Sequence, residues 1–117
     1  MSAGPPPRFT HVSSDFHGVS AAYLRDPALL AGLLIAAAGA GGFPMTTPPS
    51  TRALPGDGVA AVLLLEHCRI ALHTVPAREL LLLDVLSAPP HDAARVVDVF
   101  ARRLSPRDVR SETRQRG

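Results

Sequence analysis

The chain of 117 residues contains a single cysteine, Cys68, and it has no lysine and no tryptophan. One cysteine excludes an intrachain disulfide framework and favours a reducing environment, so we expect a cytoplasmic protein. The longest apolar run, residues 28–40, is shorter than the roughly 20 residues of a transmembrane helix and is typical of a buried helix. No charged segment followed by a secretory hydrophobic core opens the chain. We therefore expect no membrane association.

Several motifs that carry known chemistry are also missing. His67, Cys68 and His73 have neither Cys-x-x-Cys nor His-x-x-x-His spacing and lack an obvious fourth ligand, so we expect no metal site. The glycines within residues 39–42 follow a predicted helix and indicate its C-terminal end rather than a phosphate-binding loop. The sequence contains no nucleophile elbow.

The net charge is only +2, but the basic residues are unevenly distributed. Within residues 102–116 only Asp108 and Glu112 oppose a group of six arginines, namely Arg102, Arg103, Arg107, Arg110, Arg114 and Arg116. Such a segment could bind nucleic acid or an acidic partner. Because it lacks interleaved aromatic residues, we favour a solvated basic tail over residues 105–117, which could include a short strand, and we consider nucleic-acid binding unlikely.

The first half of the chain predicts one strand and one helix in a single domain over residues 9–104, after a proline-rich, disordered segment at residues 1–8. The strand covers residues 9–16. Asp26 as an N-cap and Pro27 at the first helical position predict a helix over residues 27–38. A short edge strand is expected over residues 43–47, followed by a loop over residues 48–58.

The second half predicts three strands, over residues 59–65, 69–74 and 80–86, and a helix over residues 91–104. The strands are apolar without alternation, so both of their faces should be covered. We expect a two-layer α+β sandwich, an antiparallel sheet with two helices on one face. A second copy of the chain is expected to cover the other face, forming a homodimer through the sheet.

The segment of residues 58–85, GVAAVLLLEHCRIALHTVPARELLLLDV, contains the candidate chemistry. Taken alone, Cys68 has the pattern of a small buried hydrophobic residue, and His73 that of a histidine at the edge of the core. The same segment also resembles the processing region of the small bacterial S-adenosylmethionine decarboxylases. The matching elements are Gly58-Val59, His73-Thr74, Pro76 and Asp84-Val85, and the resemblance extends over about residues 9–104.

The resemblance implies a pyruvoyl enzyme that makes its own cofactor. In that family a serine attacks the preceding carbonyl, the chain is cut, and the resulting pyruvoyl group forms a Schiff base with the substrate amine. The family pattern around the cut is Glu-Ser-His, and here the same positions hold His67, Cys68 and Arg69. The implied cleavage site is therefore the bond between His67 and Cys68, and a pyruvoyl cofactor is expected only if Cys68 processes itself.

The residues that assist this chemistry in the family are only partly present. By position, Ala60 replaces a serine that assists processing, and Ala88 replaces the cysteine that protonates the decarboxylated intermediate. Alanine can neither donate nor accept a proton, so both functions are missing at these positions. His73 matches the processing histidine. A neighbouring cation lowers the pKa of a thiol, and Arg69 is adjacent to Cys68, with His67 and His73 expected nearby.

Three functional hypotheses follow. In the first, the chain lacks conventional pyruvoyl chemistry and binds S-adenosylmethionine or a related amino compound, or serves as a regulatory partner of an active relative. In the second, Cys68 is the pyruvoyl precursor of an active decarboxylase in polyamine (spermidine) or specialised-metabolite synthesis. In the third, the scaffold performs new chemistry, with Cys68 and His73 as catalytic residues and His67 and Arg69 binding substrate, Arg69 by bidentate contact with a carboxylate.

Overall fold

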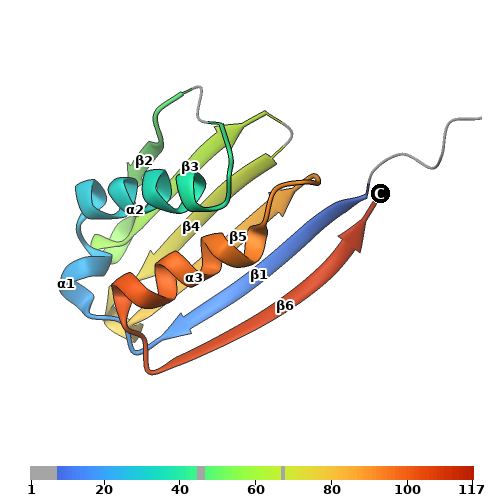
Figure 1. Ribbon diagram of the computed structural model, residues 1–117. Helices are drawn as coiled ribbons and strands as arrows, with labels where there is room; N and C mark the ends of the chain where they lie inside the picture. The colour runs from blue at the N-terminus through green and yellow to red at the C-terminus, as the bar shows by residue number, and fades with distance from the viewer. Residues whose placement is uncertain (1–7, 45–46, 67) are drawn as a thin grey trace, which may run out of the picture.

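The computed structural model describes residues 8–44, 47–66 and 68–117. A six-stranded antiparallel sheet, in the order β2-β3-β4-β5-β1-β6, forms one layer, and the helices form the other. Figure 1 shows α2 and α3 side by side on one face of the sheet. The two-layer α+β sandwich expected from the sequence is therefore confirmed. The short helix α1, Ala21–Leu24, is an addition to the two expected helices.

The two long helices begin at aspartate caps. The carboxylate of Asp26 accepts a hydrogen bond from the N–H of Leu29 (3.1 Å), and α2 then runs over Pro27–Ala40. The carboxylate of Asp92 accepts one from the N–H of Ala94 (3.0 Å) and starts α3, Ala93–Leu104, two residues after the expected position. Each cap satisfies an N–H group that the helix itself leaves without a partner.

Three central strands, β3 (Val59–Leu65), β4 (Cys68–Val75) and β5 (Leu80–Ser87), agree closely with the expected ranges. Strand β1 extends over Phe9–His17 and pairs with β5 from Thr10 to His17. The side chains that face the helices form one core, in which the rings of Phe16 and Phe100 lie 6.4 Å apart. The helices therefore cover one face of these strands only.

The two edges of the sheet differ from the expectations. Strand β2 is Ser50–Ala53, inside the segment expected to be a loop, and it forms because its backbone pairs with Val59–Val62 of β3. The strand expected over residues 43–47 is not found in its described part, where Phe43 packs into the core, and residues 45 and 46 lie outside the described residues. At the other edge, residues of the expected basic tail form the nine-residue strand β6, Asp108–Arg116, paired with β1.

No helix among the described residues is long and apolar enough to span a membrane.

Candidate functional site

The segment that carries the motif, residues 58–85, forms the centre of the sheet. Alternate side chains of a strand point to opposite faces, and the burial pattern of β4 follows that rule. Cys68, Ile70, Leu72 and Thr74 face the helices and are buried, whereas Arg69 and His73 are exposed. We call the face without helices the outer face. Its central side chains are Ala60, Val62, Leu64, Arg69, Ala71, His73, Val75, Leu80, Leu82, Asp84 and Leu86.

Cys68 is the first residue of β4 and lies on the helix side of the sheet. Its thiol is 3.4 Å from the carbonyl oxygen of Glu66, to which it donates, and only 7% of the residue is exposed. Burial raises the pKa of this thiol, because the thiolate loses hydration. A neighbouring cation was expected to lower the pKa of this thiol, but the effect of burial is larger and the pKa is raised. His67, with its expected roles at the cleavage site and in substrate binding, lies outside the described residues.

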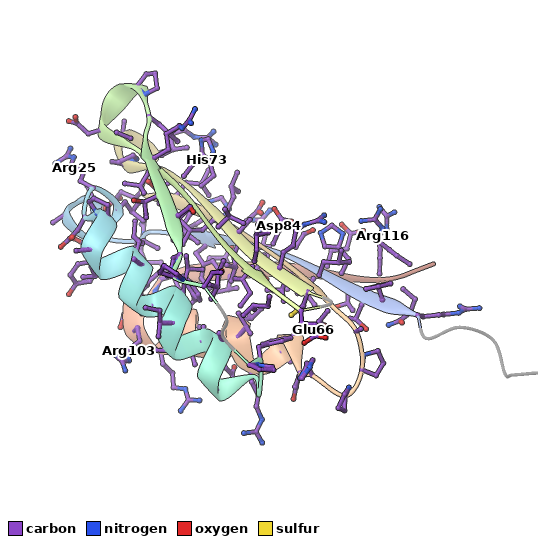
Figure 2. All side chains as sticks on the ribbon, turned by 90° about the horizontal axis from the view of Figure 1, so that it is seen from above. Arg25, Glu66, His73, Asp84, Arg103 and Arg116 are labelled. Carbon is purple, nitrogen blue, oxygen red and sulfur yellow. The ribbon has the colours of Figure 1, made fainter. Side chains whose placement is uncertain are left out.

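Arg69 and His73 lie on the outer face, four residues apart on β4, which corresponds to roughly 13 Å along the strand. Figure 2 shows His73 and Asp84 on the side of the sheet away from the helices. Cys68 and His73 are separated by roughly 17 Å along the strand and lie on opposite faces. The expectation that His73 lies near the thiol is therefore wrong within one chain.

The two positions at which the resemblance expects proton-transfer groups offer none. Ala60 of β3 lies directly opposite His73 in the register of the sheet, so the imidazole has a methyl group as its neighbour there. Ala88 follows β5, and its carbonyl oxygen accepts a hydrogen bond from the N–H of His91 (3.3 Å). Neither alanine side chain can move a proton.

Other motif residues have a structural role. The hydroxyl of Thr74, which is 2% exposed, accepts a hydrogen bond from the N–H of Val59 and donates one to the carbonyl oxygen of Leu24, both 2.8 Å long. A Cβ atom on Gly58 would lie 2.6 Å from the carbonyl oxygen of Thr74, so only glycine fits there without a shift. These contacts join β3, β4 and the end of α1. The retention of Gly58, Val59 and Thr74 is therefore explained by folding, and it gives no evidence for catalysis.

The structure adds a polar pair that the sequence analysis missed. On the outer face, Nε2 of His11 lies 3.3 Å from Oδ1 of Asp84, and the side chain of His11 is 21% exposed. The two residues are 73 positions apart, so only the pairing of β1 with β5 brings them together. One signal in the sequence could have pointed to this pair: His11 has an outward position in the alternating pattern of its strand.

Two hollows occur on the outer face. A cavity of about 460 Å³ lies over the small side chains of β3 and β4 and is lined by Ser50, Thr51, Arg52, Ala60, Ala61, Val62, Ala71 and Leu72. A second cavity, of about 280 Å³, is lined by Phe9, Arg69, Leu86, Arg116 and Gly117. The second cavity places two guanidinium groups, Arg69 and Arg116, beside apolar side chains. Carboxylates and phosphates are the groups that arginine binds in bidentate fashion.

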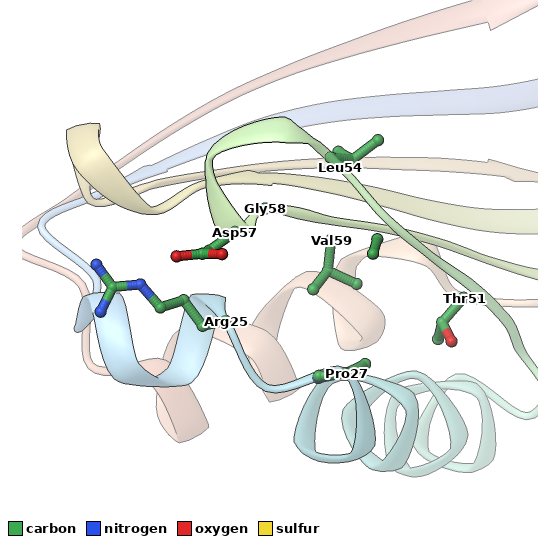
Figure 3. A pocket seen from close by; sticks show the side chains of 8 residues that line it. Arg25, Pro27, Thr51, Leu54, Asp57, Gly58 and Val59 are labelled. Atoms are coloured by element: carbon green, nitrogen blue, oxygen red, sulfur yellow. The ribbon is translucent and has the colours of Figure 1, made fainter.

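A third cavity, of about 490 Å³, lies beside β2 at the start of α2 and is lined by Arg25, Pro27, Thr51, Ala53, Leu54, Asp57, Gly58 and Val59. Figure 3 shows the charged side chains of Arg25 and Asp57 at the same end of this cavity. Within the described part of the chain, no group of three or more His, Cys, Asp or Glu residues is arranged to hold a metal ion.

Comparison with known proteins places this geometry in a family. The model of the S-adenosylmethionine decarboxylase family matches residues 10–117. The crystal structure of the adenosylmethionine decarboxylase from Aquifex aeolicus VF5 superposes with a TM-score of 0.86 and 24% identity, covering 97% of this chain and 93% of that one, and it supports the same fold. No curated protein matches the chain significantly in sequence. Because the family model spans nearly the whole sheet and all three helices, the chain belongs to the S-adenosylmethionine decarboxylase family.

Proposed function

We propose that this chain is a family member without conventional self-processing, pyruvoyl-dependent decarboxylation. It would bind S-adenosylmethionine or a related amino compound, or act as a regulatory homologue beside an active relative. The observation that carries the proposal is that Ala60 and Ala88 occupy the two positions where the resemblance expects proton-transfer groups, while the Cys68 thiol is buried. Cys68 and His73 also do not meet within one chain, but they have the spacing of the family pattern, so this separation does not distinguish the chain from an active relative.

The chemistry of processing explains why the buried thiol and the two alanines matter. Attack on the preceding carbonyl requires the thiolate, and burial raises the pKa of the Cys68 thiol, which lowers the thiolate fraction at neutral pH. A base within hydrogen-bond reach would be needed to compensate. Ala60 and Ala88 supply no proton-transfer group, and a second copy docked on the outer face would bring its own His73 to the face opposite Cys68. The chain would then stay intact and carry a free thiol.

The outer face supports binding of a small molecule. Arg69 lines a hollow together with Arg116, which suits a ligand carboxylate, and the apolar side chain of Leu86 lies beside them. S-adenosylmethionine and other amino acids carry such a carboxylate. Arg69 is therefore our candidate for substrate or ligand binding, as the sequence indicated.

The outer face also supports a homodimer through the sheet. Most of its central side chains are apolar, and Leu64 is 61% exposed, the largest exposed fraction among the large hydrophobic residues that the structure describes. An uncovered apolar sheet face is typical of an interface. A second copy would cover this face and would turn the open hollows into sites enclosed between two subunits.

The alternative, an active decarboxylase that uses Cys68 as pyruvoyl precursor, has one observation in its favour. Cys68 lies immediately after the connection between β3 and β4, and its thiol already contacts the backbone there, at the carbonyl oxygen of Glu66. A change in this connection could therefore bring the thiol to the carbonyl of the preceding residue. The two functions predict different products and can be separated directly.

The test combines turnover and binding. We expect no release of labelled carbon dioxide when the purified chain is incubated with carboxyl-labelled S-adenosylmethionine. In calorimetry we expect saturable binding that Arg69→Ala weakens and Arg78→Ala, which changes an arginine in the turn between β4 and β5, does not. Sustained carbon dioxide release that disappears in Cys68→Ala would establish the active enzyme instead. Absence of binding, together with a monomeric chain, would overturn the ligand-binding proposal.

A further inference from the structure

Helix α2 has an unusual composition for a surface helix. Its 14 residues, PALLAGLLIAAAGA, include no charged or polar side chain. One side is buried against the sheet through Leu30, Leu33, Leu34, Ala37 and Ala38. The opposite side is exposed, and Ala28, Gly32, Ile35 and Gly39 lie on it, with Ile35 42% exposed. A surface helix ordinarily turns charged and polar residues toward water, so this side of α2 is apolar without a structural need.

The exposed side of α2 borders a groove that runs between α2 and α3. A cavity of about 400 Å³ is lined by Tyr23, Ala28, Leu29, Gly32, Leu33, Ala36 and Arg103. A second cavity, of about 290 Å³, continues along the same helix pair and is lined by Ala36, Ala40, Val99, Arg102 and Arg103. Ala36 and Arg103 belong to both, so the two cavities form one elongated groove. Four small residues of α2, Ala28, Gly32, Ala36 and Ala40, line it beside larger apolar side chains and leave room for another backbone to approach closely.

The charge along this groove has one sign. Arg102 and Arg103 line its α3 side, and no acidic residue lines either cavity. Arg102 has a distant partner in Asp98 (3.9 Å), with both side chains more than 70% exposed, whereas Arg103 forms no ion pair within the described residues. Figure 2 shows Arg103 on the helix side of the molecule, pointing away from the sheet. The groove therefore combines an apolar floor with a basic rim.

We propose that the groove between α2 and α3 binds an amphipathic helix of a partner protein, with apolar residues on the floor and acidic residues facing Arg102 and Arg103. Charge complementarity disfavours a second copy in this place, because the same basic rim would be brought near itself. Shape favours a helix over a lipid surface, because the lining residues form an elongated hollow between two helices. The partner would dock on the side of the molecule opposite the outer face, so this inference is independent of the proposed ligand site.

The test uses a defined probe with the full-length chain. The probe is a fluorescein-labelled synthetic helix of roughly 21 Å, the length of α2, with leucines at every third or fourth position and glutamates flanking them. We expect saturable binding in fluorescence anisotropy. The matched peptide with lysine in place of glutamate should not bind, because its charges repel the arginine rim.

Two pairs of variants locate the binding surface. Arg103→Glu should weaken binding roughly 3- to 10-fold, because an exposed attraction becomes a repulsion. The control Arg78→Glu makes the same charge change in the turn between β4 and β5, at a residue that lines neither cavity, and should leave binding unaltered. Gly32→Glu places a carboxylate on the floor and should weaken binding more than about 10-fold. Gly32→Ala has open space for its Cβ atom and should bind like the parent chain.

Any one of four peptide-binding results would overturn the proposal: equal binding of the lysine peptide, no binding of the glutamate peptide at its solubility limit, an equal effect of Arg103→Glu and Arg78→Glu, or retained binding in Gly32→Glu. Co-sedimentation with vesicles of anionic phosphatidylglycerol that Gly32→Glu abolishes would assign the groove to lipid and would also overturn it.

Discussion

Replacing Thr74 by valine removes the hydroxyl that joins three parts of the fold while keeping the shape of the side chain. The N–H of Val59 and the carbonyl oxygen of Leu24 would each lose a 2.8 Å hydrogen bond in a region where Thr74 is 2% exposed. A buried polar group left without a partner costs about 1–3 kcal/mol. We therefore expect Thr74→Val to lower the free energy of unfolding by about 2–5 kcal/mol.

The matched control is Thr74→Ser, which retains the hydroxyl and loses one methyl group, at a cost of about 1 kcal/mol. The measurement is urea unfolding followed by circular dichroism. With a slope of about 1–3 kcal/mol per molar urea, the midpoint of Thr74→Val should fall by at least about 0.7 M, and by more than that of Thr74→Ser. A valine variant as stable as the serine variant would refute the structural role given to this motif residue.

Three further predictions concern single residues. Gly58→Ala should lower the free energy of unfolding by about 2 kcal/mol or more in the same urea assay, because its Cβ atom would lie 2.6 Å from the backbone oxygen of Thr74. In the native chain, Cys68 should react with a thiol reagent at pH 8 more slowly than a free thiol, and more quickly as the pH is raised, because burial raises its pKa and depletes the thiolate; a faster reaction than that of free cysteine would contradict this. Asp26→Ala should cost about 1 kcal/mol in thermal unfolding through the lost N-cap, whereas Asp98→Ala, a change on the exposed side of α3, should cost less than half of that.

Local signals in the sequence were enough to predict most of the fold. Asp26 followed by Pro27 marked the start of α2, and the apolar run over residues 59–65 matched β3 from end to end. Strand β2 was missed because its four residues are all exposed and show no alternation of apolar and polar side chains. It exists through backbone pairing with β3, which is a tertiary effect that local patterns do not contain.

The candidate site was less accessible to prediction. The spacing of five residues between Cys68 and His73 places them on opposite faces of any regular strand, so the alternation rule alone argues against their contact. The resemblance led us to expect contact between Cys68 and His73, because the family uses both positions in processing. It does not specify whether one subunit supplies both residues. The pair of His11 and Asp84, and the contact of Thr74 with Leu24, join residues far apart in the sequence. Only strand order and packing reveal such contacts.

The central claim, that the chain remains uncut with a free thiol at Cys68, is tested most directly by intact-protein mass spectrometry of the freshly purified, untagged chain. We predict one species at the full-length mass, unchanged over days, which gains the mass of one thiol label after unfolding. Two fragments divided between His67 and Cys68, the second blocked at its amino terminus, would contradict the account and identify a working pyruvoyl enzyme.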